Sequence, residues 1–181
     1  MIFEEKTIQL KDGSTAVLKT PCTEDVEQML HYLITVCGET DFLSRYPEER
    51  SITLQQEEAW INRLRTSPDT LGIACYLNGK VTGCCEINFL NGLKMCHRAA
   101  VHIALLRDYW NLGIGSTMFR EMINAAQSRG TEIMELAFLE GNHRAKYLYE
   151  KFGFRVVAEI PKAYKRKDGT YQNEYHMQKY L

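Results

Sequence analysis

The sequence has no surplus of charge of either sign and no long hydrophobic run. Its 22 Lys and Arg residues face 23 Asp and Glu residues, which leaves a formal net charge of −1. Without a positive field the chain is not expected to bind nucleic acid or an anionic membrane, so a neutral or small-molecule partner is the default expectation. No stretch approaches the roughly 18 apolar residues of a membrane span. The first seven residues, MIFEEKT, do not resemble a secretory signal.

Disulfide and metal-binding patterns are also missing. The six cysteines show no CxxC spacing, and Cys96-His97 together with His102 match no common metal site. Without a secretion signal, we interpret the cysteines as reduced thiols of a cytoplasmic protein that holds no metal. The four prolines form no Pro/Gly/Ser-rich linker, and the sequence has no repeat or low-complexity tract. A single domain over residues 1–181 is therefore expected.

What the sequence does contain is a regular succession of strand-like and helical segments. Strand-like runs are expected at residues 7–20, 71–77, 81–90, 95–106, 133–139, 154–160 and 175–181. Hairpin turns are expected at Asp12-Gly13, Asn78-Gly79 and Asn91-Gly92. Helices are expected from a Thr23 cap to near Gly38, from a Thr53/Gln56 capping box onward, after Gly115, and over 142–152. The predicted order is β-α-α-β-β-β-α-β-α-β-β.

Residues 101–116, VHIALLRDYWNLGIGS, join a strand to a Gly-x-Gly turn and then directly to an amphipathic helix. Gly113 and Gly115 allow a ligand to approach the backbone closely, and the free N–H groups of the helix start point toward it. Together with the positive end of the helix dipole, this arrangement predicts a pyrophosphate-binding site. The Lys of a Walker loop is absent, and Met118 stands where a dinucleotide fingerprint has its third Gly, so both of these motifs are rejected.

A second motif follows the strand at 133–139. Residues 142–154, NHRAKYLYEKFGF, fit the pattern Asn-x-x-Ala-x-x-Leu-Tyr-x-Lys-x-Gly-Phe at every position. Together with the Gly-x-Gly segment, this motif resembles the GNAT superfamily of N-acetyltransferases. The resemblance covers the order of elements from about Thr7 to the end. It implies an α/β (α+β) fold, with a mixed, mostly antiparallel sheet of about seven strands that is splayed at strands 4 and 5 and flanked by four helices.

The resemblance implies acetyl-CoA as co-substrate and assigns its binding residues. The pyrophosphate would be held by the backbone amides of Asn111, Leu112, Gly113, Ile114, Gly115 and Ser116. The main chain of Ile103, Ala104 and Leu105 would pair with the pantetheine arm like an added strand. Asn142, Ala145 and Tyr149 share one helix face at i, i+3 and i+7, where Asn142 would hold a pantetheine amide. Trp110 replaces the usual Gln or Arg of the family, which removes one side-chain contact to the pyrophosphate.

The implied reaction is direct attack of a primary amine on the acetyl thioester in a ternary complex. An alkylamine titrates at about 10.4 and a thiol at about 8.5, so a base for the amine and an acid for the sulfur both favour it. We expect Tyr149 to be the general acid and a backbone N–H near Leu105 to stabilise the oxyanion.

Glu86 is the first choice for the base. A two-residue turn at Asn91-Gly92 would place it opposite His97, and a four-residue turn would place it opposite Ala99. Family members often carry the base on the strand that corresponds to residues 95–106, where this chain has no carboxylate. His97, His102 and a water relay therefore remain alternatives.

The acceptor is expected to be a small-molecule or peptide amine bound near the second helix, the loop Thr40–Arg50 and the C-terminal strands. The candidate lining residues are Phe42, Tyr46, Tyr164 and Tyr175. Apolar residues in the first half of that loop hint at a homodimer. An alternative function is a catalytically silent CoA-binding sensor or interaction module of the same fold, against which the intact Tyr149 argues.

Overall fold

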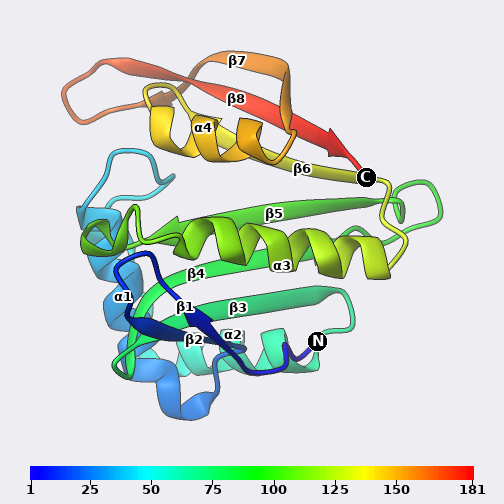
Figure 1. Cartoon of the computed structure of the whole chain (residues 1–181). Coiled ribbons are helices and arrows are strands. Elements are labelled where there is room, and N and C mark those ends of the chain that lie inside the picture. Colours follow the sequence, from blue (N-terminus) through cyan, green and yellow to red (C-terminus); the bar gives the residue numbers. More distant parts are fainter.

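An eight-stranded sheet runs through the computed structural model, which describes residues 1–181 (Figure 1). Its strands are β1 (Lys6–Gln9), β2 (Thr15–Lys19), β3 (Thr70–Leu77), β4 (Lys80–Phe89), β5 (Arg98–Leu105), β6 (Ile133–Leu139), β7 (Arg155–Lys165) and β8 (Tyr171–Tyr180). They lie in the order β1-β2-β3-β4-β5-β6-β8-β7, and only β5 and β6 pair in parallel. The mixed, mostly antiparallel sheet is thus confirmed. The expected number of about seven strands is one too low, because the Asp12-Gly13 turn separates two strands, β1 and β2.

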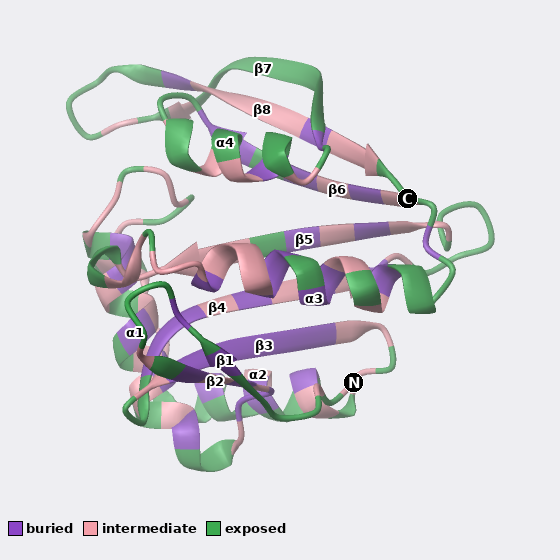
Figure 2. Cartoon of the chain, in the orientation of Figure 1, coloured by how far each residue is buried: buried purple, intermediate pink, exposed green.

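Four helices cover the sheet, two on each face, as expected. They are α1 (Val26–Gly38), α2 (Leu54–Thr66), α3 (Ile114–Ser128) and α4 (His143–Lys151). One core cluster packs α3 and α4 against the sheet through residues such as Phe119 and Tyr149, and a second packs α1 and α2 through Tyr32 and Ile61. Figure 2 shows β3 buried over most of its length and β7 exposed over most of its length. None of the helices combines the length and the apolar character needed to cross a bilayer.

Helix starts follow the local sequence closely in one case and not in another. The capping box of α2 is confirmed, since the Gln56 N–H donates to the Thr53 hydroxyl oxygen at 3.2 Å and the Thr53 N–H donates to Gln56 Oε1 at 2.9 Å. Thr23 does not cap α1. It begins a short 3-10 turn, Thr23–Asp25, whose capping residue is Cys22, because the Cys22 N–H donates to the Asp25 carboxylate at 2.9 Å.

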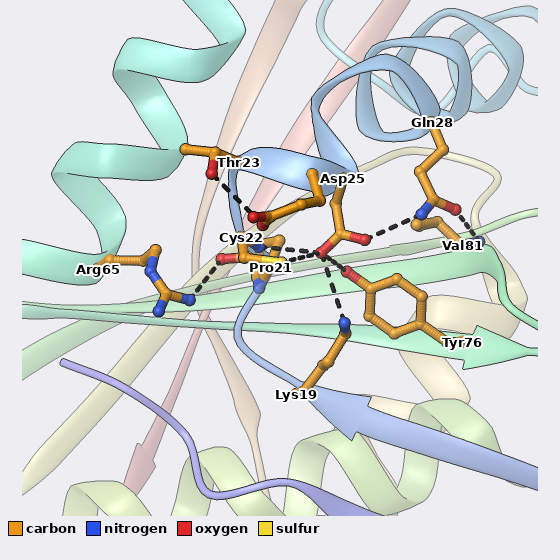
Figure 3. A network of polar contacts seen from close by, with 10 residues as sticks. Lys19, Pro21, Cys22, Thr23, Asp25, Gln28, Arg65, Tyr76 and Val81 are labelled. Atoms are coloured by element: carbon orange, nitrogen blue, oxygen red, sulfur yellow. Dashed lines mark hydrogen bonds and ion pairs between the residues drawn. The ribbon is translucent and has the colours of Figure 1, made fainter.

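Asp25 is the centre of a buried polar network that ties the start of α1 to the sheet (Figure 3). Its carboxylate accepts hydrogen bonds from the Tyr76 hydroxyl at 2.8 Å and from the Gln28 side-chain amide at 2.9 Å. The Lys19 ammonium lies 3.7 Å from the same carboxylate. Burial acts to raise the pKa of Asp25, but the hydrogen bonds from Cys22 and Tyr76 and the charge of Lys19 hold it below its ordinary value. The ionised carboxylate therefore fixes α1 against β2 and β3.

The loop between β4 and β5 is longer than an Asn-Gly turn predicts. Neither strand extends into residues 90–97, which form the loop. As a result, Glu86 pairs with His102. The predictions that placed Glu86 opposite His97 or Ala99 are wrong, because they assumed turns of two or four residues.

The strands β5 and β6 pair at one end only. Their register runs from Arg98 opposite Ile133 to Ala100 opposite Glu135, and there the pairing stops. The Arg98 guanidinium and the Glu135 carboxylate form an ion pair at this joined end. In Figure 1 the two strands diverge toward the left, and the light-blue loop between α1 and α2 lies near their separated ends. The expected splay is thus confirmed, between the strands that a seven-strand count numbers 4 and 5.

Candidate active site

The divergence of β5 and β6 opens into a cleft of about 1180 Å³. Residues from the starts of α3 and α4 border it on one face of the sheet, and residues from α1, α2 and the loop between them border it on the other. Small-molecule sites usually occupy roughly 300–1,000 Å³. The cleft therefore has room for an extended ligand and a second, small molecule at once.

Six consecutive backbone N–H groups before and at the start of α3 have no acceptor within the chain. They belong to Asn111, Leu112, Gly113, Ile114, Gly115 and Ser116. Two left-handed residues, Asn111 (φ 67°) and Gly113 (φ 94°), turn the chain so that these groups lie around one loop. Unpaired donors at a helix N-terminus bind anions readily, since the helix dipole adds positive potential there. The loop predicted to hold a pyrophosphate therefore offers free donors in the expected place.

Three cationic side chains surround this loop, and none of them was predicted as a site residue from the sequence. The Arg144 guanidinium bonds to Asn111 Oδ1, and Lys151 Nζ lies 3.4 Å from the Ser116 hydroxyl. Lys11 is anchored beside the loop through its own N–H, which donates to the Leu112 carbonyl at 3.1 Å. All three residues border the cleft. A ligand with several phosphate groups would meet positive charge from β1–β2 and from α4 as well as the amides.

Trp110 has a structural role beside the loop. Its indole N–H donates to the Leu105 carbonyl at 2.9 Å. The Arg144 guanidinium lies over the indole, 4.7 Å from the ring centroid, a geometry that favours a cation–π contact. Trp110 brings no charge of its own to the loop, but it positions a cation that comes from α4.

The main chain of β5 faces alternately toward β4 and toward the cleft. The Leu106 N–H donates to the Thr82 carbonyl at 3.0 Å, so Leu106 faces β4, and every second residue before it faces β4 as well. Ala104 therefore directs its backbone groups toward β4, whereas Ile103 and Leu105 direct theirs toward the opening. Of the three residues expected to pair with a pantetheine arm, Ile103 offers both groups. Leu105 offers its N–H, since Trp110 occupies its carbonyl.

The Tyr32 hydroxyl is inserted into the β4–β5 ladder at this level. It donates to the Ala104 carbonyl at 2.8 Å and accepts the Cys84 N–H at 3.1 Å. Burial raises the pKa of Tyr32 well above its ordinary value, so the hydroxyl stays protonated and can make both bonds. Tyr32 thereby connects α1 to β4 and β5 at the border of the cleft.

The helix α4 presents the three residues expected on its inner face. Asn142 caps the helix, because its Oδ1 accepts the Ala145 N–H at 3.1 Å. Tyr149, two turns further on, is only 7% exposed and packs against Phe119 and Phe138, with ring centroids 5.3 and 6.0 Å away. Its hydroxyl makes no hydrogen bond within the chain, and burial raises its pKa to about 12. A free, protonated phenol therefore borders the cleft.

The candidate bases divide into two groups. Glu86 and His102 are cross-strand neighbours that both border the cleft. The Asn88 side-chain amide donates to Glu86 at 2.6 Å and fixes its orientation. His97 lies in the β4–β5 loop and does not border the cleft. The structure thus brings Glu86 and His102 together at the site and leaves His97 outside it.

Glu57 of α2 is a charged residue of the cleft that the sequence analysis missed. Its side chain is buried, with 2% of the residue exposed, and its Oε1 is enclosed without a hydrogen-bond partner. Burial raises the pKa of Glu57, and the nearby Arg50 charge opposes this only in part. The buried stripe of α2 consists of Glu57, Ile61 and Leu64. An acidic residue on an otherwise apolar helix face was the signal available in the sequence.

The loop between α1 and α2 forms the outer wall of the cleft. Two of the four aromatic residues expected around the acceptor, Phe42 and Tyr164, border the cleft. Tyr46 lies outside it, where its hydroxyl accepts the Lys167 N–H at 3.1 Å. Tyr175 stacks on Phe138, with 5.3 Å between ring centroids, and also lies outside.

Comparison with known proteins decides the family. Residues 38–154, which span both sequence motifs, match the family model described as the acetyltransferase (GNAT) family. The chain belongs to the GNAT family of acetyltransferases. As a GNAT acetyltransferase it is an N-acetyltransferase that depends on acetyl-CoA. No group of three or more His, Cys, Asp or Glu side chains is arranged to hold a metal ion.

Individual relatives agree with this assignment. The L-amino acid N-acetyltransferase AaaT of Escherichia coli (strain K12) is 27% identical to this GNAT chain over 136 residues, which are 72% of this chain and 83% of AaaT. A GNAT-family acetyltransferase from Streptococcus pneumoniae has a TM-score of 0.85 at 26% identity and covers 92% of this chain and 99% of its own. YncA from Salmonella typhimurium, solved with its cofactor acetyl-CoA, has the same fold, with a TM-score of 0.79 at 16% identity over 92% of this chain and 94% of its own.

Proposed function

We propose that this GNAT protein acetylates a primary amine of a small molecule or peptide by direct attack within a ternary complex. One observation carries the proposal. The row of unpaired N–H groups around Gly113 and the free hydroxyl of Tyr149 open onto one continuous cleft. That cleft also reaches the opposite face of the sheet. Acetyl-CoA bound at α3 and α4 therefore leaves the side of α1 and α2 free for the amine.

The residues present fit acetyl-CoA, which supplies an activated acetyl thioester. The N–H groups of residues 111–116 hold the pyrophosphate, and Arg144 and Lys151 add positive charge beside them. The exposed main-chain groups of Ile103 and Leu105 extend the sheet by pairing with the pantetheine arm. Asn142 uses its Oδ1 as a helix cap, which leaves its side-chain N–H groups for a pantetheine amide.

Tyr149 is the general acid of this proposal. With a pKa of about 12 its hydroxyl stays protonated at neutral pH, and no group of the chain competes for its proton. A thiol titrates at about 8.5, so complete proton transfer from Tyr149 to a free thiolate is uphill. The hydroxyl therefore contributes chiefly by donating a hydrogen bond to the sulfur while the C–S bond breaks. The Leu105 N–H, which faces the cleft, is the donor available for the developing oxyanion.

Glu86 is the base that we propose for the amine. It lies on the acceptor side of the cleft, and the Asn88 amide holds one of its oxygens in place. His102, directly across the ladder, gives a path by which the proton can pass to solvent, because it is exposed. A water relay serves the same purpose if the amine is bound beyond the direct reach of Glu86.

The test begins with calorimetric titration of the protein with acetyl-CoA, followed by an assay of released thiol over a panel of primary amines. Binding with amine-dependent thiol release is the expected result. Binding without release from any amine would contradict the proposed turnover and would favour a CoA-binding sensor. Absence of binding would contradict the cofactor site itself.

Two further properties are part of the proposal. All six cysteines are unpaired thiols, three of them buried, which fits a cytoplasmic protein because thiols stay reduced there. A homodimer through the apolar loop between α1 and α2 stays a prediction. Sedimentation equilibrium of the purified chain tests it directly.

A further inference from the structure

Two side chains of opposite charge border the acceptor side of the cleft without neutralising each other. Glu57 is buried, and its Oε1 has no hydrogen-bond partner. The one side-chain hydrogen bond of Arg50 runs from Nε to the Cys37 sulfur at 3.4 Å, so its two terminal nitrogens have no acceptor. Arg50 is close enough to lower the pKa of Glu57, yet the two groups form no ion pair. Both residues border the cleft, so a ligand bound there can contact a carboxylate and a guanidinium that do not pair with each other.

This pair borders the same cleft as the point where the acetyl group is expected. Glu57 shares the cleft lining with Glu86 and Cys84. Cys84 in turn pairs with Ala104, the residue before Leu105. A ligand amine held at Glu57 therefore lies in the same cleft as Leu105.

The other charged groups of the same wall do not offer this arrangement. The Glu49 carboxylate accepts the Tyr46 N–H at 2.7 Å and serves as a turn cap. Arg45 is exposed at the outer edge of the loop. The remaining surface around the pair is mostly apolar, with Met29, Leu33, Val36, Leu43 and Trp60 on the lining.

We propose that Glu57 and Arg50 are the specificity-determining residues of the acceptor site, and that they select a free α-amino acid with an apolar side chain. Glu57 binds the ammonium group and Arg50 binds the adjacent carboxylate, which matches the fork of a guanidinium. An α-amino acid carries these two charges on neighbouring atoms, whereas a peptide N-terminus lacks the neighbouring carboxylate. The inference rests on the proposed acetyl transfer and adds the chemical class of its acceptor.

Three amines with the same side chain test the selection. L-Leucine has both charged groups, L-leucinamide lacks the carboxylate, and 3-methylbutylamine lacks the whole carboxyl group. With wild-type protein and saturating acetyl-CoA, we expect kcat/KM for leucine to exceed that for the other two by on the order of 10²-fold, because an Arg–carboxylate pair in a buried site discriminates strongly.

Two charge-removing variants assign the roles. Arg50→Gln should reduce kcat/KM for leucine by on the order of 10²-fold and leave the values for the two amines without a carboxylate nearly unchanged. Glu57→Gln, which keeps the side-chain shape, should reduce kcat/KM for all three amines. Glu58→Gln changes an exposed neighbour on α2; it is the matched control and should leave all three values unchanged. The affinity for acetyl-CoA should stay the same in every variant.

Several outcomes would overturn the inference without affecting the proposed acetyl transfer. These are equal use of leucine and leucinamide by the wild type, an equal loss for all three amines in Arg50→Gln, or transfer to other amines but not to leucine. Failure to bind acetyl-CoA would contradict the proposed function instead. In that case leucine binding, followed by the tryptophan fluorescence of a Trp110→Phe variant, in which Trp60 on the cleft lining is the only tryptophan, still decides the inference. Quenching that Arg50→Gln abolishes supports it, and no response overturns it.

Discussion

At the scale of single residues, Tyr149 combines features that separate a catalytic role from a packing role. Its ring is part of an aromatic cluster, whereas its hydroxyl has no partner in the chain. Tyr149→Phe should therefore keep the packing and the free energy of unfolding, and lower kcat by on the order of 10²-fold. The affinity for acetyl-CoA, measured by calorimetry, should change little. Because the pKa of the hydroxyl is about 12, the wild-type kcat should show no loss from its ionisation below about pH 11.

Tyr180→Phe is the matched control for this substitution. Tyr180 ends β8 with 70% of the residue exposed, and it does not border the cleft. Its variant should match the wild type in kcat and in thermal stability. An unchanged kcat in Tyr149→Phe would show that Tyr149 is only a packing residue, and a large loss of stability would show that its hydroxyl has a partner.

Glu57 predicts a dependence of stability on pH whose sign follows from the direction of its pKa shift. Burial raises the folded-state pKa above the unfolded value of about 4.3, so the folded protein binds a proton that the unfolded chain has already lost. Ionisation therefore costs stability as the pH rises from about 4 through the folded-state pKa. Glu57→Gln removes this cost and should raise the free energy of unfolding at pH 8 by roughly 1 kcal/mol.

Urea denaturation at pH 4 and at pH 8 measures the effect. The difference between Glu57→Gln and wild type should be near zero at pH 4 and positive at pH 8. The control, Glu58→Gln, changes an exposed carboxylate on the same helix and should show no such trend. A variant less stable than wild type at pH 8 would mean that the folded protein holds Glu57 charged and paired. A gain in stability together with a loss of activity is expected of a functional residue.

Tyr149 and Glu57 differ in how far their roles could be predicted from the sequence. Tyr149 was predictable because it belongs to a motif of fixed spacing within one helix. Glu57 was not predicted, because its burial depends on the packing of α2 against α1 and β3, and α1 lies apart from α2 in the sequence. In the sequence, Glu57 resembles the many acidic residues that favour the first turn of a helix. Only its position four residues before the buried Ile61 indicated otherwise.

At the scale of elements, the loop before α3 depends on Gly113. Its φ of 94° lies in the left-handed region, which a β-branched residue adopts only with strain. The only neighbour that a Cβ at this position would meet is the Lys11 side chain, at 3.6 Å, so the protein itself leaves the space open. Gly113→Val would fill that space and deflect the free N–H groups. We expect the affinity for acetyl-CoA, measured by calorimetry, to fall at least tenfold.

Gly79→Val is the matched control for the backbone strain. Gly79 has a similar φ of 76° in the β3–β4 turn, a Cβ added there would meet nothing within 4 Å, and the residue lies outside the cleft. Both variants should lose similar stability, but Gly79→Val should bind acetyl-CoA as the wild type does. Equal affinities in the two variants would contradict the pyrophosphate assignment of the loop.

Elements were easier to predict than the way they pair. The strand at 133–139 and the glycine that ends α4 were predicted at their observed positions, because periodicity and Gly153 are local signals. The β4–β5 register was not predicted, because the Asn-Gly pair is followed by N–H groups of Met95 and Cys96 that both bond to the Gly92 carbonyl. That small coil lengthens the loop, and no rule for two-residue turns anticipates it. The longer loop also changes the site, because the residue opposite Glu86 is His102 and not His97.

At the scale of the whole molecule, the sheet consists of two parts joined by a short seam. Strands β1 to β5 form one part and strands β6 to β8 form the other. The two parts are paired only through β5 and β6, at the three residues Arg98 to Ala100 of β5. The core on the α3 and α4 face, together with the Arg98–Glu135 ion pair, supplies the rest of the connection. A ligand that pairs with β5 and contacts α4 would bridge the two parts where β5 and β6 are not paired. Its binding would then stabilise the β6–β8 part against local unfolding.

This arrangement predicts how acetyl-CoA changes stability across the molecule. At a concentration 100 times its Kd, a ligand that binds only the folded state adds about 2.7 kcal/mol, which for a chain of this length raises Tm by roughly 5–10 °C. Hydrogen exchange should slow most in α4, β6 and β8, because these elements depend on the open end of the seam, and least in β1 and β2 at the far edge. At the same concentration of acetyl-CoA, both effects should be clearly weaker in Gly113→Val than in the wild type. Uniform protection of all strands would mean that β1–β5 and β6–β8 already unfold as one unit, and that the short β5–β6 pairing does not limit the stability of the fold.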